Sequence, residues 1–238
     1  MSSFQGTIRK SVNNALLQFE KIGYASQNLA NFNTNGYKSV SFDEIMTTEG
    51  YTKTVVRTNT AQGGFMRTNK PLDICIQGAG YIPVTSPEGN IYYTRDGNFT
   101  IDKNGVLKTT SGDIVGGGIV IDANAEKIEI KKDGTILSYK TKTSKGEHIG
   151  TIPLVVFNNP EALKEVGGNK YEKTEESGEA TLQKDHDKIA QWGIERSNVD
   201  MYNEVTGIMR TNAQLIAQYR LIRQVSEIYK NGIEIIGG

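Results

Sequence analysis

The stretch IRKSVNNALLQFEKIGYASQNL, residues 8–29, decides the fold at one end of the chain. Its apolar residues recur in alternating steps of four and three, and Ser26 fills one polar place in that series. This spacing is the heptad pattern of a coiled-coil helix, so it predicts a long first helix that ends at the turn-forming residues 33–36. The predicted seam of this helix comprises Ile8, Val12, Ala15, Phe19, Ile22 and Leu29.

The stretch VTGIMRTNAQLIAQYRLIRQVSEIY, residues 205–229, repeats that rhythm near the other end of the chain. Ser197 and Asp200 fit a capping box that begins this helix, and Asn231-Gly232 is a typical stop signal. Asn212 and Ser226 interrupt the apolar series. The predicted seam of the second helix comprises Val205, Ile208, Leu215, Tyr219, Ile222 and Tyr229.

Both helices carry apolar stripes that are wider than a two-position seam. Met209, Ile216, Val225 and Ile228 broaden the stripe of the second helix. A helix with so wide an apolar face packs against more than one neighbour. An isolated two-helix hairpin that buries its own seam is the simpler alternative, but two helices alone offer little core. The pattern therefore favours a bundle formed between several chains.

The middle of the chain reads as short strands separated by turns. Asp96-Gly97, Asn104-Gly105, Ser111-Gly112 and Asp133-Gly134 separate short β-prone runs, as in antiparallel hairpins. We therefore expect an α+β fold, with paired terminal helices and a middle antiparallel β domain that forms a sandwich or an open barrel. The expected domains are a discontinuous terminal-helix assembly domain (1–33 and 198–238), an extended or β linking region (34–75 and 189–197) and a β-rich outer domain (76–188).

Composition excludes several functions. The chain has 27 basic and 27 acidic residues, and this balance favours neither nucleic acid nor a membrane surface as a partner. It has no apolar run long enough for direct membrane insertion, and its first residues lack the pattern of a cleavable secretory signal. The single cysteine, Cys75, and the two histidines, His148 and His186, form no metal-ligand or catalytic spacing. We expect no catalytic residues, no metal site and no cofactor.

Several short sequence motifs resemble those of a known protein family. NLANFNTNGYK at 28–38 resembles the NLAN-x-NT-x-G-[FY]-[KR] signature of the bacterial flagellar rod and hook family of axial proteins. The resemblance continues through KPLDICIQGAGY at 70–81, YTRDGNF at 93–99 and IERSNVD at 194–200. The matching family positions are Asn28, Leu29, Ala30, Asn31, Asn33, Thr34, Gly36, Tyr37, Lys38, Pro71, Leu72, Asp73, Gly78, Gly80, Thr94, Arg95, Asp96, Gly97, Ser197, Asn198 and Val199.

The resemblance implies a structural subunit of the flagellar rod, the drive shaft of the basal body. Its terminal helices would form a helical tube with copies of itself and other axial rod proteins. The surrounding ring proteins are a further candidate partner. The resemblance also implies that the flagellar type III apparatus exports the chain to the periplasmic part of the basal body without cleaving a signal peptide.

Two questions stay open from the sequence. The short segment from Gly36 to Pro71 favours a proximal-rod subunit, and a distal-rod subunit is the alternative. A member of a different class, an enzyme or a ligand-binding protein with a pocket in its β domain, would need chemistry that the sequence lacks.

Overall fold

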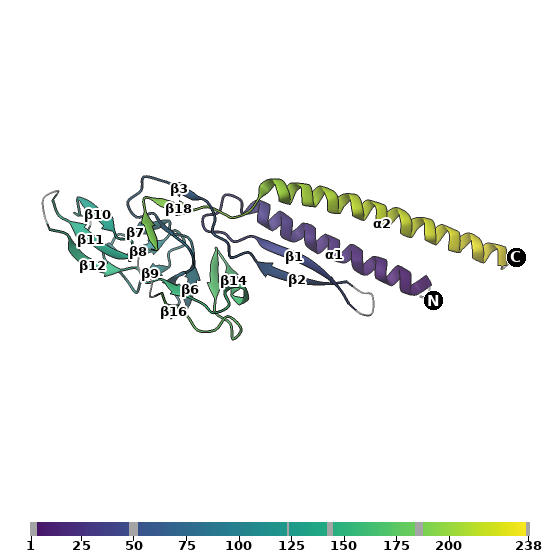
Figure 1. Cartoon of the computed structure of the whole chain (residues 1–238), viewed down its shortest axis with the longest axis horizontal. Coiled ribbons are helices and arrows are strands. Elements are labelled where there is room, and N and C mark those ends of the chain that lie inside the picture. The colour runs from purple at the N-terminus through teal and green to yellow at the C-terminus, as the bar shows by residue number, and fades with distance from the viewer. Residues whose placement is uncertain (1–3, 48–51, 123, 142–144, 184–187, 237–238) are drawn as a thin grey trace. The chain divides into compact units, whose positions relative to one another are not determined.

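The computed structural model describes residues 4–47, 52–122, 124–141, 145–183 and 188–236. The chain divides into two compact units (Figure 1). The helical unit holds residues 1–30, 40–57 and 200–238, and the β-rich unit holds residues 31–39 and 58–199. Residues 40–57 of the expected linking region therefore belong with the helices.

The helical unit is built on two long helices, α1 (Phe4–Ala30) and α2 (Met201–Ile236), which contact each other. Strands β1 (Val40–Met46) and β2 (Thr52–Thr58) form a two-stranded sheet, and β1 packs on α1. None of the described helices combines the length and the apolar character that a membrane span requires.

The ends of α2 differ from the sequence prediction. Asp200, and not Ser197, caps the helix, because its Oδ1 accepts a hydrogen bond from the backbone N–H of Asn203 (3.1 Å). The Ser197 hydroxyl instead accepts from the N–H of Val199 (3.2 Å). The predicted stop at Asn231-Gly232 is wrong, since α2 continues through both residues to Ile236. A glycine ends a helix only where the backbone turns at that residue. Inside a continuing helix it only lowers the helix propensity.

The β-rich unit contains a seven-stranded antiparallel sheet in the order β14-β15-β6-β5-β9-β8-β7. Its strands are β5 (Ile82–Thr85), β6 (Ile91–Thr94), β7 (Phe99–Ile101), β8 (Leu107–Thr109), β9 (Ile114–Val115), β14 (Lys164–Gly167) and β15 (Lys170–Glu172).

Smaller antiparallel sheets complete the described part of this unit. One is three-stranded, β10-β11-β12, and three are pairs, β17-β4, β18-β3 and β13-β16. Their bounds are β3 (Phe65–Arg67), β4 (Ile74–Ile76), β10 (Lys127–Ile130), β11 (Thr135–Tyr139), β12 (Glu147–Thr151), β13 (Val155–Val156), β16 (Thr181–Leu182), β17 (Ile189–Gln191) and β18 (Gly193–Glu195), with a 3₁₀ helix at Pro160–Ala162. The predicted α+β class and the paired terminal helices are confirmed.

Three of the four predicted glycine turns connect paired strands. Residues 104–105 lie between β7 and β8, 111–112 between β8 and β9, and 133–134 between β10 and β11. Asp96-Gly97 differs, because β6 and β7 do not pair. Gly97 instead allows two backbone segments to lie close together, because a Cβ at this residue would lie 1.8 Å from the carbonyl oxygen of Ile74.

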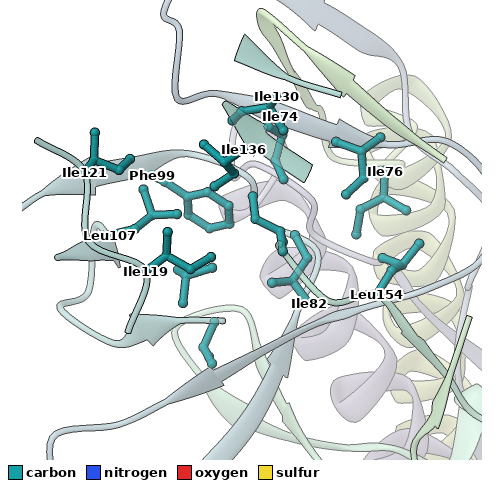
Figure 2. Close-up of a cluster of buried hydrophobic side chains, with 14 residues drawn as sticks. Ile74, Ile76, Ile82, Phe99, Leu107, Ile119, Ile121, Ile130, Ile136 and Leu154 are labelled. Atoms are coloured by element: carbon teal, nitrogen blue, oxygen red, sulfur yellow. The ribbon is translucent and has the colours of Figure 1, made fainter. Parts of the chain in front are cut away.

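The main hydrophobic core lies inside the β-rich unit (Figure 2). Figure 2 shows side chains from several strands converging, and Ile74, Ile82, Leu107 and Ile136 are fully buried. A second cluster gathers aromatic side chains around Tyr81. Burying one of the aliphatic side chains of the main core contributes about 1.5–3 kcal/mol to the free energy of unfolding. The β-rich unit therefore has its own core.

Candidate assembly surface and motif cluster

The two helices meet along a face that is offset from the predicted seam. On α2 the less exposed positions alternate by four and three as Glu204, Ile208, Thr211, Leu215, Gln218, Ile222 and Val225. Ile208, Leu215 and Ile222 belong to the predicted seam, but the positions between them are one residue earlier than predicted. On α1 the half-buried seam residues are Ile8, Ala15, Ile22 and Leu29, and Gln18 is buried.

The other predicted seam residues face outward in the single chain. These are Val12, Phe19, Val205, Tyr219 and Tyr229, and the exposed fractions of Phe19 and Tyr219 reach 63% and 66%. Further apolar side chains of α2 are exposed beside them, namely Met201, Tyr202, Met209, Ile216, Leu221 and Ile228. Exposed apolar surface on this scale typically marks a contact with another molecule.

Asn28, the first motif residue, organises the helical unit. Its amide makes two hydrogen bonds with the backbone of Val40, the Nδ2 donating to the carbonyl and the Oδ1 accepting from the N–H (both 2.9 Å). The same Nδ2 donates to Glu204 Oε1 of α2 (2.7 Å). Burial raises the pKa of Glu204 above its ordinary value, and the Asn28 hydrogen bond partly opposes that rise. One buried side chain thus connects α1, β1 and α2.

The turn after α1 is shaped by the next motif residues. Thr34 donates its hydroxyl to Asn31 Oδ1 (3.0 Å), and its N–H bonds the carbonyl of Asn31 (3.1 Å). Gly36 has φ +67°, in the left-handed region that favours glycine. Its N–H donates to the Glu195 carbonyl (2.8 Å), and a Cβ there would lie 2.7 Å from the Arg95 carbonyl.

A buried ionic triad lies next to this turn. Lys38 Nζ contacts Glu195 Oε1 at 2.6 Å. Arg95 Nε donates to Glu195 Oε2 at 2.9 Å, and Arg95 Nη2 lies 2.8 Å from the same oxygen in an ion pair. Lys38 and Glu195 are fully buried, and Arg95 is 3% exposed. Burial and the nearby Arg95 charge lower the pKa of Lys38, while Glu195 opposes this.

Backbone groups also form hydrogen bonds with each member of the triad. Lys38 donates to the Ala61 carbonyl (2.6 Å), and Glu195 Oε1 accepts from the N–H of Gly63 (2.8 Å). Arg95 donates to the carbonyls of Gly80 (2.7 Å) and Gly78 (2.9 Å). Each buried charge is therefore both paired and hydrogen-bonded, which burial of charges requires.

Asn198 adds a second tie among the same segments. Its Oδ1 accepts from the N–H of Ser39 (2.7 Å), and its Nδ2 donates to the carbonyls of Asn59 (2.8 Å) and Ala61 (2.9 Å). Its own N–H donates to the carbonyl of Tyr37 (3.3 Å). These bonds bring together residues 36–39, 59–63, 78–80, 94–97 and 194–199. We call this group of segments the motif cluster.

Two motif carboxylates, Asp73 and Asp96, lie beside the strands β4 and β7, where Asp73 forms an isolated bridge with Asn98. Asp73 is 1% exposed, and its Oδ1 has no hydrogen-bond partner among the described residues. Asp96 Oδ1 accepts from the N–H of Asn98 (2.9 Å). Burial, with a smaller contribution from the Asp73 charge, raises the pKa of Asp96 to about 6. The charge of Asp96 therefore changes near pH 6.

The remaining motif residues have local roles. Pro71 accepts a hydrogen bond from Gln191, and Thr94 donates to the Asn169 carbonyl. Leu72 packs against the main core, and Val199 is buried. Ala30 and Asn33 are exposed, and Asn33 Oδ1 accepts from Arg196.

Sequence reasoning missed two residues of the motif cluster. Glu195 lies within the IERSNVD motif, but neither its spacing nor its neighbours mark it as the partner of Lys38 and Arg95. Gln62 donates to the Ile76 carbonyl (3.0 Å) and accepts from the N–H of Gly78 (2.8 Å), and nothing in its spacing marked it. Among the described residues no group of three or more metal-ligating side chains occurs. His148 is exposed, and His186 lies outside the described residues.

Comparisons with known proteins identify the class. Residues 75–138 match the family model of the flagellar hook protein FlgE/F/G D1 domain. The chain is 36% identical to the flagellar basal-body rod protein FlgG of Caulobacter vibrioides over 154 residues, which cover 63% of this chain and 59% of that protein.

Two longer matches carry the same name. The chain is 31% identical to FlgG of Buchnera aphidicola subsp. Acyrthosiphon pisum over 214 residues, covering 78% of this chain and 82% of the relative. It is 28% identical to FlgG of Bacillus subtilis, covering 90% and 93%. The chain belongs to the flagellar basal-body rod protein family. It is a structural subunit of the flagellar rod in the basal body, where it assembles with other axial proteins.

Proposed function

We propose that the chain polymerises through α1 and α2 into the helical tube of the rod and transmits torque along it. The observation that carries this proposal is the unequal covering of apolar surface. The β-rich unit buries its apolar residues in a core, whereas the helices expose Val12, Phe19, Val205, Tyr219 and Tyr229. Burying these side chains against neighbouring subunits supplies a driving force at about 25 cal/mol per Å².

The test places a charge in that surface. Tyr219→Asp leaves the single chain's contacts intact because the side chain is 66% exposed, so the protein is expected at its normal level. In the tube the carboxylate would be buried without a partner, which costs several kcal/mol at each repeat. We expect rods that stop where this subunit joins, seen by electron microscopy of isolated basal bodies. The control Thr100→Asp, on an exposed position of β7, should assemble normally. Normal rods in Tyr219→Asp cells would refute the proposal.

For the rod type, the FlgG name of these relatives favours a distal-rod subunit over the proximal type to which the short 36–71 segment pointed. We also propose export by the flagellar type III apparatus without signal cleavage, a position in the periplasmic part of the basal body, and contact with the surrounding rings. The family membership supports these assignments. Cross-linking in cells tests the contacts with the export apparatus and the rings, and the mass of the N-terminal peptide in the assembled chain tests the absence of cleavage.

We further propose that the chain catalyses no reaction. The named relatives are rod proteins, and the three buried charges of the triad, Lys38, Arg95 and Glu195, pair with one another. Reproducible turnover of a substrate by the purified chain would contradict this assignment.

A further inference from the structure

A basic groove lies on the β-rich unit beside the single tryptophan of the chain. The groove encloses about 590 Å³, and Trp192 lines it together with the turn that joins β10 to β11. Two backbone hydrogen bonds close this turn, from the N–H of Lys131 to the Thr135 carbonyl (2.9 Å) and from the N–H of Gly134 to the Lys131 carbonyl (3.0 Å). The fold of the unit therefore sets the position of the turn.

Trp192 occupies an unfavourable backbone conformation. Its φ is +72°, in the left-handed region that a large side chain rarely adopts. Two hydrogen bonds hold the backbone there, because its N–H donates to the Asp73 carbonyl (2.9 Å) and its carbonyl accepts from the N–H of Thr68 (3.0 Å). The side chain is still 38% exposed, so packing inside the unit does not explain why a large ring stands at this position. Residues in strained conformations gather at binding sites, and tryptophan is a frequent anchor of protein interfaces.

The charge of the groove is positive, since three lysines and two acidic residues line it. Lys127 pairs with Glu129 (3.0 Å), and Asp133 Oδ1 accepts a backbone hydrogen bond within the turn (2.9 Å). Lys131 and Lys132 are exposed, and their side chains form no hydrogen bond or ion pair with a described residue. A weaker attraction joins Lys131 to Glu129 and Asp133. Two adjacent ammonium groups are thus available beside an exposed indole.

A second turn of the same unit carries the opposite charge. Glu175 and Glu176 are exposed after β15, and their side chains have no hydrogen-bond or ion-pair partner among the described residues. The flanking residues fix the turn, because the N–H of Thr174 donates to Ser177 Oγ (2.9 Å) and the N–H of Ser177 donates to Thr174 Oγ1 (3.1 Å). The neighbouring Lys173 has its own carboxylate partner, 2.7 Å away. Two adjacent carboxylates are therefore presented on a hydrogen-bonded turn.

The two turns belong to different parts of the β-rich unit. Figure 1 shows β10 and β11 toward one end of this unit, whereas β14, which pairs with β15 next to the acidic turn, lies toward the other end. A contact between the basic groove and the acidic turn therefore joins two copies. Because it uses two different surfaces, it is a head-to-tail contact, and such contacts build open helical arrays.

We propose that the groove formed by Lys131, Lys132 and Trp192 receives the turn of Glu175 and Glu176 from a second copy of the chain. The inference rests on the proposed function, since it requires copies that lie next to each other in the rod. Exposed ion pairs add little affinity, but complementary charges favour one orientation and one register over others. The apolar helical faces supply the driving force of assembly, and this contact aligns the β-rich units.

The first test exchanges the charges of the two turns. Lys131→Glu with Lys132→Glu brings four carboxylates together, so incorporation into basal bodies is expected to fall at least fivefold while the urea midpoint of the free chain stays unchanged. Glu175→Lys with Glu176→Lys should have the same effect. The chain with all four substitutions regains complementary charges, so its incorporation should return to within twofold of the parent. The control Lys103→Glu, in the exposed turn between β7 and β8, should assemble normally. Normal incorporation of either double variant, or no rescue by the combination, would overturn the proposal.

The second test determines which surfaces meet. A chain with both Lys132→Cys and Glu176→Cys should give a ladder of disulfide-linked oligomers when isolated basal bodies are oxidised, because each copy is then linked to two neighbours. Either substitution alone should give no linked species, and the native Cys75 is buried. Dimers from a chain with one substitution would refute the head-to-tail arrangement. The absence of a ladder in basal bodies that contain the chain would refute this contact and leave the proposed function standing, whereas absence of the parent chain from basal bodies would refute both.

Discussion

Lys38 and Glu195 form a fully buried ion pair, with Nζ and Oε1 2.6 Å apart and the two residues 157 positions apart in the chain. The pair joins the segment that leaves α1 to the segment that returns toward α2. Arg95 completes it from the middle of the β-rich unit. These three residues lie in different sequence motifs. The triad therefore gives a physical reason why the motifs occur in the same chain.

Removing the central carboxylate should destabilise the β-rich unit strongly. Glu195→Gln leaves Lys38 and Arg95 buried without a counter-charge, a change that typically costs about 3–5 kcal/mol. Urea unfolding followed by Trp192 fluorescence measures the difference. The matched control is Glu179→Gln, since its ion pair with Lys173 is largely exposed and is worth at most about 1 kcal/mol. Similar losses in both variants would show that the triad has no special role.

Gly36 should tolerate substitution less well than another glycine with positive φ. Gly36→Val is expected to cost on the order of 1–3 kcal/mol from the backbone conformation, and more because its Cβ would meet the Arg95 carbonyl at 2.7 Å. Gly89 also has positive φ but has open space around it, so Gly89→Val bears the conformational cost alone. The difference between the two unfolding free energies isolates the close approach. Equal values would mean that the chain avoids the contact at little cost.

The β-rich unit should be more stable in mild acid because of Asp96. The pKa of Asp96 is raised to about 6 in the folded state, so the folded chain binds a proton more tightly than the unfolded chain. This contribution is fully present below pH 3.8, the ordinary pKa, and is lost as the pH rises through 6. It amounts to at most about 3 kcal/mol. Asp96→Asn should remove it, so the difference in urea midpoint between parent and variant should grow from pH 4 to pH 7. A constant difference would contradict the assignment.

The terminal helices should be the least protected part of the free chain. The apolar side chains on their outer faces are exposed to solvent. Polar residues such as Gln18 and Thr211 are buried where the helices meet. We therefore expect fast amide hydrogen exchange in α1 and α2 of the verified monomer and slow exchange in the core strands. Strong protection of both helices in the monomer would show that they are ordered before assembly.

The helices and the short strands could be predicted from the sequence because both follow from local periodicity and turn chemistry. The face on which α1 meets α2 could not. Apolar spacing selects the most hydrophobic stripe, whereas Gln18 and Thr211 face inward and Phe19 and Tyr219 are exposed. A chain that assembles divides its apolar residues between internal and external contacts, and spacing alone does not separate the two.

The motif cluster shows a second limit. The resemblance selected Lys38 and Arg95, but the spacing of single residues contains no sign that Glu195 pairs with both. Likewise the sequence predicts too early an end for α2, because Gly232 resembles a stop signal although the helix continues to Ile236. Long-range pairing and helix continuation depend on tertiary structure.

The most direct test of the central claim is hydroxyl-radical footprinting of the outer helical faces before and after assembly. In the free chain Phe19 and Tyr219 are exposed, so both should be oxidised readily. In isolated basal bodies we predict at least a tenfold loss of reactivity at both residues, while Tyr37, which is buried in the β-rich unit, stays unreactive throughout. If Phe19 and Tyr219 remain as reactive in basal bodies as in the free chain, these faces do not build the rod and the account is wrong.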